Sequence, residues 1–464
     1  MGNLSVKAAG GLFLSVLLIL LVGNGVLGFE LKVMIIVCIA LLTLCCKCQG
    51  IAFAEIMDGY SERVKEMAPA FLIILGIGYL IASFMIAGTS PVLVSILTEC
   101  IHPRYILVLS FMFVTVLSSL IGTSFASLGT LGIIMFNAAV IQSVPPVMAA
   151  STVISGAVFG GFISPFNDNM NATPGLYGMD VYEVIRKNRI PFVVSVIITL
   201  VLYLLMGLKY VGGDQEETMK TLVSFQKTVR YYFDTNILCI LPLIVAIAFA
   251  IRKVNIIINL FISGSLGVLF GIFQQGFSLK KCLYALYWGF QSAEFFPGED
   301  VDELLRFLVD RGGIFSMLEV FSFVLLMLLM AELLNQTGVF RALQKTRFGE
   351  VKNPFLLTVV TFLSCELLTL VTLDGIPTGV VSKDMLSNIY IKAGYDPKKI
   401  ARVSIVTCNW LGNWIPWSFC ANYFAGVCGV SVWAVMPYTL CLALPTIVML
   451  IQSALGIGNE RLRM

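Results

Sequence analysis

The chain has 464 residues, of which 58% are hydrophobic and only 12% are charged. Soluble domains carry about a quarter charged residues, so this composition excludes an ordinary soluble protein and predicts a protein of the lipid bilayer. The formal net charge of +3 says little by itself, and no nucleic-acid partner is expected.

Apolar runs recur along the whole chain, each long enough to cross a hydrocarbon core of about 30 Å. In chain order they are 11–28, 31–48, 69–88, 105–121, 145–163, 190–208, 236–251, 256–273, 314–334, 354–373, 405–429 and 432–455. The longest polar stretches, 210–232 and 274–313, are predicted to be loops. We therefore predict one integral domain over 1–464, an all-α polytopic membrane protein with about 11–13 transmembrane helices.

Basic residues orient the predicted spans. They gather in the three loops around 186–189, 252–253 and 341–352, and again near the end at 461–463. The three loops are separated from one another by even numbers of spans, and by the positive-inside rule we expect them, with the basic residues near the end, to lie in the cytoplasm. The expected location is the cell membrane, as a multi-pass protein of a bacterial cytoplasmic membrane.

The residues needed for common enzyme chemistry are missing. His102 is the single histidine, and the twelve cysteines include no metal-binding pair of the CxxC kind. Serine-hydrolase and metalloprotease motifs are absent as well. We therefore expect no enzyme and no cofactor, and any proton transfer would fall to carboxylates.

The first unusual segment, 122–132, is too rich in glycine and hydroxyl groups for an ordinary lipid-facing helix. Glycine lets the backbone bend, and unwound carbonyls with hydroxyls can replace water around a cation. We predict a re-entrant hairpin; the alternative is a close helix-packing face. Its candidate binding residues are Thr123, Ser124, Ser127 and Thr130.

The second segment, 164–171, interrupts an apolar run with a proline and several polar groups. It predicts a broken helix whose candidate binding residues are Ser164, Asn167, Asp168, Asn169 and Asn171. A carboxylate at membrane depth costs about 2.5–3.5 kcal/mol, so it needs a neutralising partner. No Lys or Arg lies near Asp168 in the sequence, which leaves a proton or a small cation. The alternative is an ordinary aspartate at a helix end.

The second half of the chain contains a comparable pair of segments. Asp374 and Thr378 lie in the breaker-rich stretch 373–379, and Asn409, Asn413 and Trp417 lie in a predicted broken helix over 409–418. Asp374, like Asp168, is a candidate ligand of a transported sodium ion, although an ion pair with Lys383 is the alternative.

The order of these segments suggests an internal duplication. In each half a flexible polar stretch is followed by a broken helix, which is the arrangement of inverted-repeat transporters. We therefore predict two inverted repeats, approximately 50–208 and 236–455, with re-entrant hairpins and broken helices.

Four segments together carry a resemblance to a known family; they are 122–124 with 128–130, 163–169, 311–317, and 415–417 with Cys420 and 429–430. They resemble the NhaC-type sodium/proton antiporters over about residues 50–450. The resemblance implies an ion-transporter fold, often a homodimer, that exchanges sodium for protons or also carries an organic anion such as malate or lactate. Asn167 and Asn169 depart from the family pattern by replacing a serine and a threonine.

These observations predict a secondary active transporter in which Asp168 binds a proton or a sodium ion, never both, because a buried carboxylate cannot hold two positive charges cheaply. The alternative is a sodium- or proton-coupled carrier of an organic anion or an amino acid on the same scaffold. That alternative requires a basic residue inside the cavity, and Arg402 is the best candidate.

Overall fold

The structure is a computed structural model that describes residues 5–165, 167–210, 215–339, 351–372, 375–459 and 461. Within these ranges the chain is helical, and the one β contact is an isolated bridge between Tyr395 and Arg461. Nine helices in the described part are long and apolar enough to cross a membrane. The predicted all-α polytopic membrane fold is confirmed.

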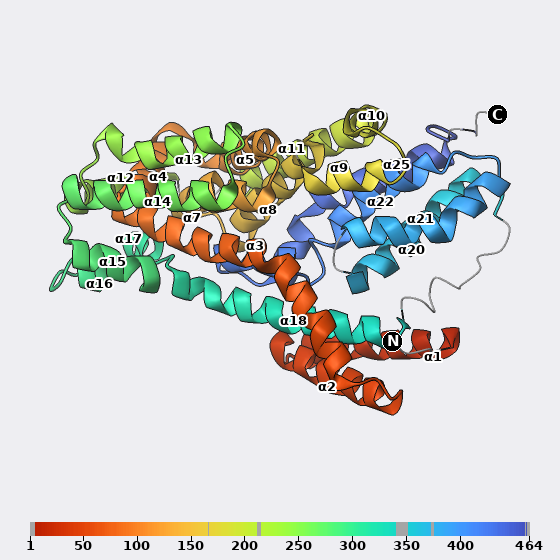
Figure 1. Ribbon diagram of the computed structural model, residues 1–464. Coiled ribbons are helices and arrows are strands. Elements are labelled where there is room, and N and C mark those ends of the chain that lie inside the picture. The colour runs from red at the N-terminus through yellow and green to blue at the C-terminus, as the bar shows by residue number, and fades with distance from the viewer. Residues whose placement is uncertain are drawn as a thin grey trace.

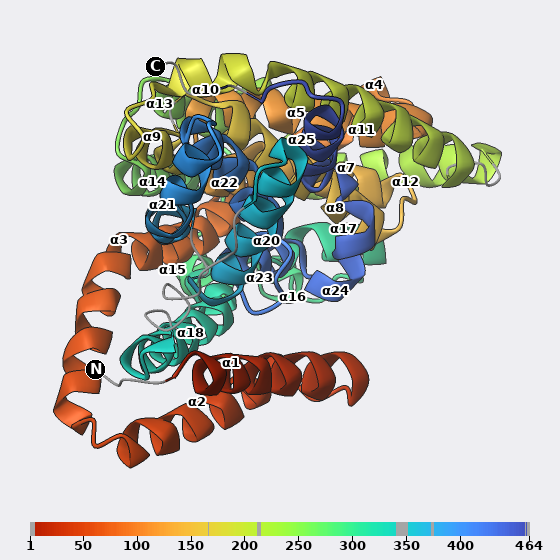
Figure 2. The same ribbon diagram turned by 90° about the vertical axis from the view of Figure 1, so that its right-hand side faces the viewer.

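The N-terminal helices form an arm beside the main body. The arm consists of α1 (Val6–Leu20), which continues as a π-helix over Leu21–Val26, and α2 (Leu31–Cys48). α2 packs against both α1 and α18 (Leu318–Gln336), and Figure 2 shows the arm beside α18. The long helix α3 (Phe53–Ile86) leads from the arm into the body.

The first half of the body contains the helices that flank the predicted polar segments. They are α4 (Thr89–Cys100), α5 (Ile106–Ile121), α6 (Ser124–Ser127), α7 (Ile133–Ile141), α8 (Pro146–Ile163), α9 (Asp168–Gly175), α10 (Val181–Lys187) and α11 (Arg189–Tyr210). The ends of α2, α5 and α8 agree with the predicted apolar runs to within one residue. Hydrophobic run length therefore located these helices well.

The middle of the chain is more helical than predicted. It contains α12 (Gln215–Tyr232), α13 (Leu241–Ile251), α14 (Ile256–Phe273), α15 (Leu279–Trp288), α16 (Ser292–Phe295) and α17 (Glu303–Val309). The predicted loops 210–232 and 274–313 are thus largely helices. The first is amphipathic and buries Leu222, Phe225 and Val229, so a polar average concealed one apolar face.

The second half contains a compact group of helices at the right-hand end of Figure 1. Here α20 (Pro354–Thr372), α21 (Gly375–Lys392) and α22 (Lys398–Leu411) contact one another and α9 and α25 (Leu444–Ala454). The short helices α23 (Phe419–Cys428) and α24 (Val432–Val435) connect α22 with α25.

Two helix pairs are sharply bent, each either a broken span or a re-entrant loop. Lys220–Tyr232 meets Ile237–Ile251 at 94°, and Phe419–Cys428 meets Val432–Tyr438 at 89°. Counting each pair as one span gives up to eleven spans in the described residues. Three further helices are apolar but shorter than these spans. They lie in α4, in α20 and in the region of α25.

Glycines allow the body helices to approach closely. A Cβ at Gly76 of α3 would lie 3.0 Å from Leu260 Cδ1 of α14, and one at Gly271 would lie 2.2 Å from Ile86 Cγ2. Gly76, in the last third of α3, thus contacts the start of α14, and Ile86 at the end of α3 contacts the end of α14. The two helices therefore run parallel. Positions along α3 can thus be used to compare how far different sites lie along the body.

Candidate functional site

The predicted break at 164–171 is present between α8 and α9. The Ser164 hydroxyl, at the end of α8, donates a hydrogen bond to the Ser119 carbonyl at 2.8 Å. The Asn167 side chain accepts one from the Met170 N–H at 3.3 Å and so caps the start of α9. These bonds hold the unwound stretch against the end of α5.

The segment around Gly122 faces the unwound stretch between α8 and α9. Gly122 has φ +86° and turns the chain from α5 into α6. Its carbonyl accepts a hydrogen bond from the Asn167 amide at 3.2 Å. A Cβ at Gly161 of α8 would lie 2.7 Å from the Ser124 hydroxyl, so glycine is needed for this close approach.

The re-entrant hairpin predicted for 122–132 is not observed. After the turn at Gly122 the chain runs as one membrane-length helical segment over Ser124–Ile141, with a π-helical stretch at Leu128–Gly132. A Cβ at Gly129 would lie 3.0 Å from Ile77 Cγ2, so this glycine serves helix packing. The alternative of a small-residue packing face describes this segment better.

The two unwound stretches, one from each half of the chain, meet at one cavity of about 500 Å³, which we call the Asn167 cavity. Thr123, Ser124 and Asn167 line it from the first half, and Asn413 lines it from the second. Asn413 lies between α22 and α23, where Ser418 caps α23 by accepting a hydrogen bond from the Ala421 N–H at 3.1 Å.

An aromatic cluster closes one side of the Asn167 cavity. Phe125 stacks on Phe419 with ring centroids 5.3 Å apart and contacts Tyr423 at 4.9 Å and Phe424 at 5.4 Å. The buried Tyr423 hydroxyl donates to the Phe125 carbonyl at 3.3 Å. Phe125 and Phe424 also line the cavity.

Five of the predicted binding residues lie outside the lining of this cavity, and the first is Ser164, whose hydroxyl donates to the Ser119 carbonyl. The hydroxyls of Ser127 and Thr130 donate to carbonyls of their own helix, at 3.1 Å and 2.6 Å. Thr378 is buried with its hydroxyl 3.5 Å from that of Thr369. The Trp417 indole donates to the Leu370 carbonyl at 3.4 Å.

The remaining predicted residues fall in parts that the structure does not describe. Asp374 lies outside the described residues. The backbone of Asp168 begins α9, directly after Asn167, but the side chains of Asp168, Asn169, Asn171 and Asn409 lie outside the described part.

Two lining residues were missed by the sequence reasoning. Lys253, in the short turn between α13 and α14, lines the Asn167 cavity together with Asn259 of α14. The Asn259 amide donates to the Ala246 carbonyl at 2.9 Å. Asn259 could have been noticed as an amide near the start of the apolar run 256–273. Lys253 was used only as a basic loop residue in the positive-inside argument.

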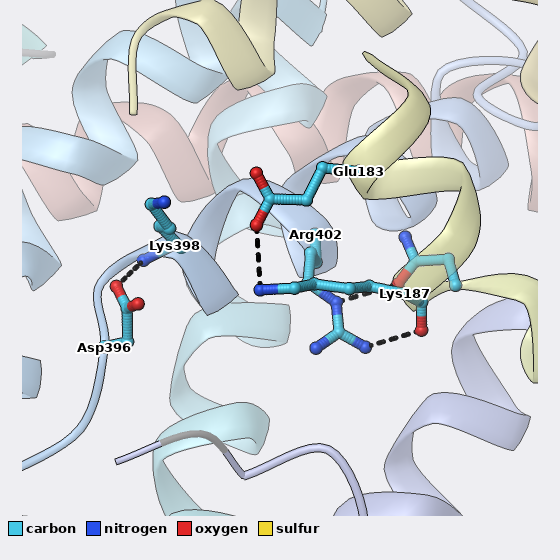
Figure 3. A network of polar contacts seen from close by, with 6 residues as sticks. Glu183, Lys187, Asp396, Lys398 and Arg402 are labelled. Atoms are coloured by element: carbon cyan, nitrogen blue, oxygen red, sulfur yellow. Dashed lines mark hydrogen bonds and ion pairs between the residues drawn. The ribbon is translucent and has the colours of Figure 1, made fainter. Parts of the chain in front are cut away.

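Arg402, the predicted anion ligand, is engaged elsewhere. Its guanidinium donates to the Asn188 side chain and to the Lys187 carbonyl, each at 3.0 Å, and so ties α22 to the end of α10. Figure 3 shows Arg402 beside Lys187, which pairs with Glu183 at 3.0 Å. The hydrogen bond from Lys187 lowers the pKa of the Glu183 carboxyl. Arg402 does not line the Asn167 cavity.

Comparison with known proteins identifies the family. The model of the Na+/H+ antiporter family matches residues 169–457, which is more than half of the chain. The chain belongs to this family. The match begins in α9 and covers both α22 and α23, so it includes the second of the two breaks that meet at the Asn167 cavity.

Relatives extend the similarity over most of the chain. An uncharacterized Na(+)/H(+) antiporter of Haemophilus influenzae is 27% identical over 416 residues, covering 89% of this chain and 88% of the relative. The Na(+)/H(+) antiporter NhaC of Alkalihalophilus pseudofirmus is 25% identical over 406 residues, covering 87% and 85%. A Malate-2H(+)/Na(+)-lactate antiporter of Bacillus subtilis is 25% identical over 393 residues, covering 84% and 81%. The NhaC-type resemblance is confirmed, and it indicates a transporter.

Proposed function

We propose that the protein exchanges sodium ions for protons across the cell membrane and that Asp168 binds the two ions in turn. The observation that carries this proposal is the meeting of both unwound stretches at the Asn167 cavity. Unwound backbone at membrane depth is tolerated only where protein or a water-filled cavity surrounds it, and transporters use such stretches to bind ions.

Competition at one carboxylate supplies the coupling. A buried carboxylate is neutralised either by a proton or by a partly dehydrated sodium ion, because holding both charges is costly. Carbonyl, hydroxyl and amide oxygens of Thr123, Ser124, Asn167 and Asn413 would complete the shell of the ion. Movement of one helix group against the other would then expose the loaded carboxylate to each side in turn.

Several parts of the proposal extend beyond the Asn167 cavity. We include Asn169, Asn171, Asp374 and Asn409 as further ligands, because each is a polar residue in one of the segments that interrupt the apolar runs. The division into inverted repeats and the homodimer are carried over from the sequence in the same way. The helix order supports the repeats, since each half contains a broken helix, α8–α9 and α22–α23.

The test replaces Asp168 with asparagine, which keeps size and hydrogen bonding but removes the charge. Sodium-dependent proton flux in proteoliposomes, followed with a pH-sensitive dye, should disappear in Asp168→Asn. Asp180→Asn is the matched control, because Asp180 caps α10 by accepting a hydrogen bond from the Tyr182 N–H and is exposed. Normal flux in Asp168→Asn, with Asp180→Asn also normal, would reject the assignment.

A second candidate is exchange that also carries an organic anion. It is favoured by the similarity to a relative named a Malate-2H(+)/Na(+)-lactate antiporter. Uptake of labelled lactate or malate that follows an imposed sodium gradient would distinguish this candidate from simple sodium/proton exchange.

A further inference from the structure

Another cavity, of about 340 Å³, has in its lining an arginine that the proposed exchange does not use. Arg311 lies in the loop between α17 and α18 and lines this cavity, together with the polar residues Asp310, Gln291 and Ser316 and the apolar residues Ile81 and Val427. We call it the Arg311 cavity. Its volume falls within the usual range for small-molecule sites, about 300–1,000 Å³.

The backbone that carries Arg311 is held in a single position. Gly312 and Gly313 have φ +80° and +83°, and the Gly313 N–H donates to the Gly78 carbonyl of α3 at 2.8 Å. A Cβ at Gly312 would lie 2.5 Å from the Ala82 nitrogen, and one at Gly313 2.2 Å from the Gly289 nitrogen. Only glycine fits this passage, so the loop presents Arg311 on rigid supports.

The charge of Arg311 is accommodated without an acid. Its Nε–H donates to the Phe307 carbonyl at 3.0 Å, and its guanidinium carbon lies 4.2 Å from the Phe307 ring centroid and 5.3 Å from that of Phe136. Among the residues that the structure describes, no carboxylate forms an ion pair with Arg311. The neighbouring Asp310 instead accepts hydrogen bonds from the Ser292 N–H and hydroxyl, at 2.5 and 3.0 Å.

This leaves most of the guanidinium donors for a ligand. Arginine carries five N–H donors in a planar fork that matches a carboxylate, and one of them is used by Phe307. An arginine that lines a cavity and has no ion pair with an acid among the described residues is a candidate binding residue for an anion. The apolar residues of the lining, among them Ile81, Ile133 and Val427, suit the carbon skeleton of an organic acid better than a small inorganic ion.

The Arg311 cavity lies deeper along α3 than the Asn167 cavity. Ile73 lines the Asn167 cavity and Ile81 lines the Arg311 cavity, which separates them by about 12 Å of helix. Between these levels Gly129, Ile77 and Tyr423 meet, with a Cβ at Gly129 placed 3.5 Å from the Tyr423 hydroxyl. The two cavities are therefore separated by packed side chains.

We propose that the Arg311 cavity binds the carboxylate group of a small organic acid, which Arg311 holds through its two terminal nitrogens. The site rests on the transport function proposed above, since it gives the organic-anion candidate a basic residue in addition to Lys253 of the Asn167 cavity, in place of Arg402. Its binding can nevertheless be measured without any ion exchange.

The experiment measures binding of sodium lactate and sodium malate to the purified full-length protein by titration calorimetry, with sodium chloride at equal ionic strength as the reference. We expect at least one carboxylate to bind, with the affinity weakened about tenfold or more in Arg311→Gln, equivalent to about 1.4 kcal/mol. Arg311→Lys keeps the charge without the fork and should fall between the two. Arg306→Gln is the matched control, because Arg306 is exposed and pairs with Asp300 at 3.6 Å.

A second variant keeps the test decisive if Arg311→Gln does not fold. Val427→Phe fills the Arg311 cavity while leaving the guanidinium in place, and it should also weaken binding. The proposal is overturned if neither carboxylate binds, if chloride competes equally, or if the folded variants bind as the parent does. Sodium-dependent proton flux in the same preparations reports on Asp168 separately, so failure of one proposal is distinguishable from failure of the other.

Discussion

Two buried glutamates show how differently a carboxyl group can be accommodated. Glu332 accepts from Arg63 Nε at 2.5 Å and from the Gln336 amide at 2.7 Å. Glu366 is 8% exposed, and neither of its oxygens has a hydrogen-bond partner among the described residues. The first glutamate is therefore part of a network, whereas the second is an unsatisfied polar group.

These surroundings predict opposite effects on stability. Glu332→Leu leaves Arg63 without its partner and should lower the free energy of unfolding by about 3 kcal/mol. Glu366→Leu removes an unsatisfied group of similar size and should leave the thermal midpoint in detergent unchanged or raise it. A loss in Glu366→Leu as large as that in Glu332→Leu would mean that Glu366 has a partner in the folded protein.

Single residues of the Asn167 cavity were predictable where polarity interrupts an apolar run. Asn167 and Asn413 stand out for that reason, and both line the cavity. The role of Arg402 was not predictable, because its acceptors, Lys187 and Asn188, are more than 200 positions away in the chain. Lys253 was missed since a charge in a short turn between spans usually only sets topology.

Helix contacts in the body depend on glycines at particular crossings. At the contact between α5 and α8, a Cβ at Gly160 would lie 2.4 Å from the Thr115 carbonyl oxygen and 2.6 Å from Ser118 Cβ. The first of these neighbours is backbone and cannot turn away. An added methyl group at Gly160 would therefore find almost no room. The crossing also adjoins the Asn167 cavity, which Val158 and Phe162 of α8 line.

We predict that Gly160→Ala forces α5 and α8 apart and lowers the free energy of unfolding by about 1–3 kcal/mol. The control is Gly11→Ala in α1, where no atom lies within 4 Å of the added Cβ. That change should be neutral or slightly stabilising, since alanine favours the helix by up to about 1 kcal/mol. Thermal unfolding in detergent measures both, and equal midpoints for the two variants would contradict the steric argument.

Helix positions were predictable to the extent that hydrophobic length defines them. The runs 31–48 and 256–273 coincide with α2 and α14 because each is uniformly apolar. The segment 122–132 was misread, since glycines that allow helix packing and glycines that allow a turn look alike in sequence. Only Gly122 has a positive φ there, and Gly129 and Gly132 remain helical.

The arrangement of distant segments around the two cavities could not be derived from the sequence alone. The Asn167 cavity combines α6, α14 and the stretch before α23, which no local pattern connects. Its Lys253 lies in a turn that the positive-inside rule assigns to the cytoplasm. Gln291 of the Arg311 cavity belongs to the segment that comes after α14. Because α14 crosses the membrane from the Lys253 turn, we expect this segment on the external side. We therefore expect the Asn167 and Arg311 cavities to open to opposite sides of the membrane.

This geometry predicts one-sided access to each cavity in the conformation described. In a variant whose twelve native cysteines are replaced, Thr123→Cys should react with a membrane-impermeant thiol reagent from the cytoplasmic side only, and Gln291→Cys from the external side only. Arg186→Cys, at an exposed position before α11, serves as the cytoplasmic marker. Sodium should slow labelling at position 123, because the bound ion and its ligands occupy the Asn167 cavity. Labelling of both cysteines from one side would show that the side chains around Tyr423 do not separate the two cavities across the membrane.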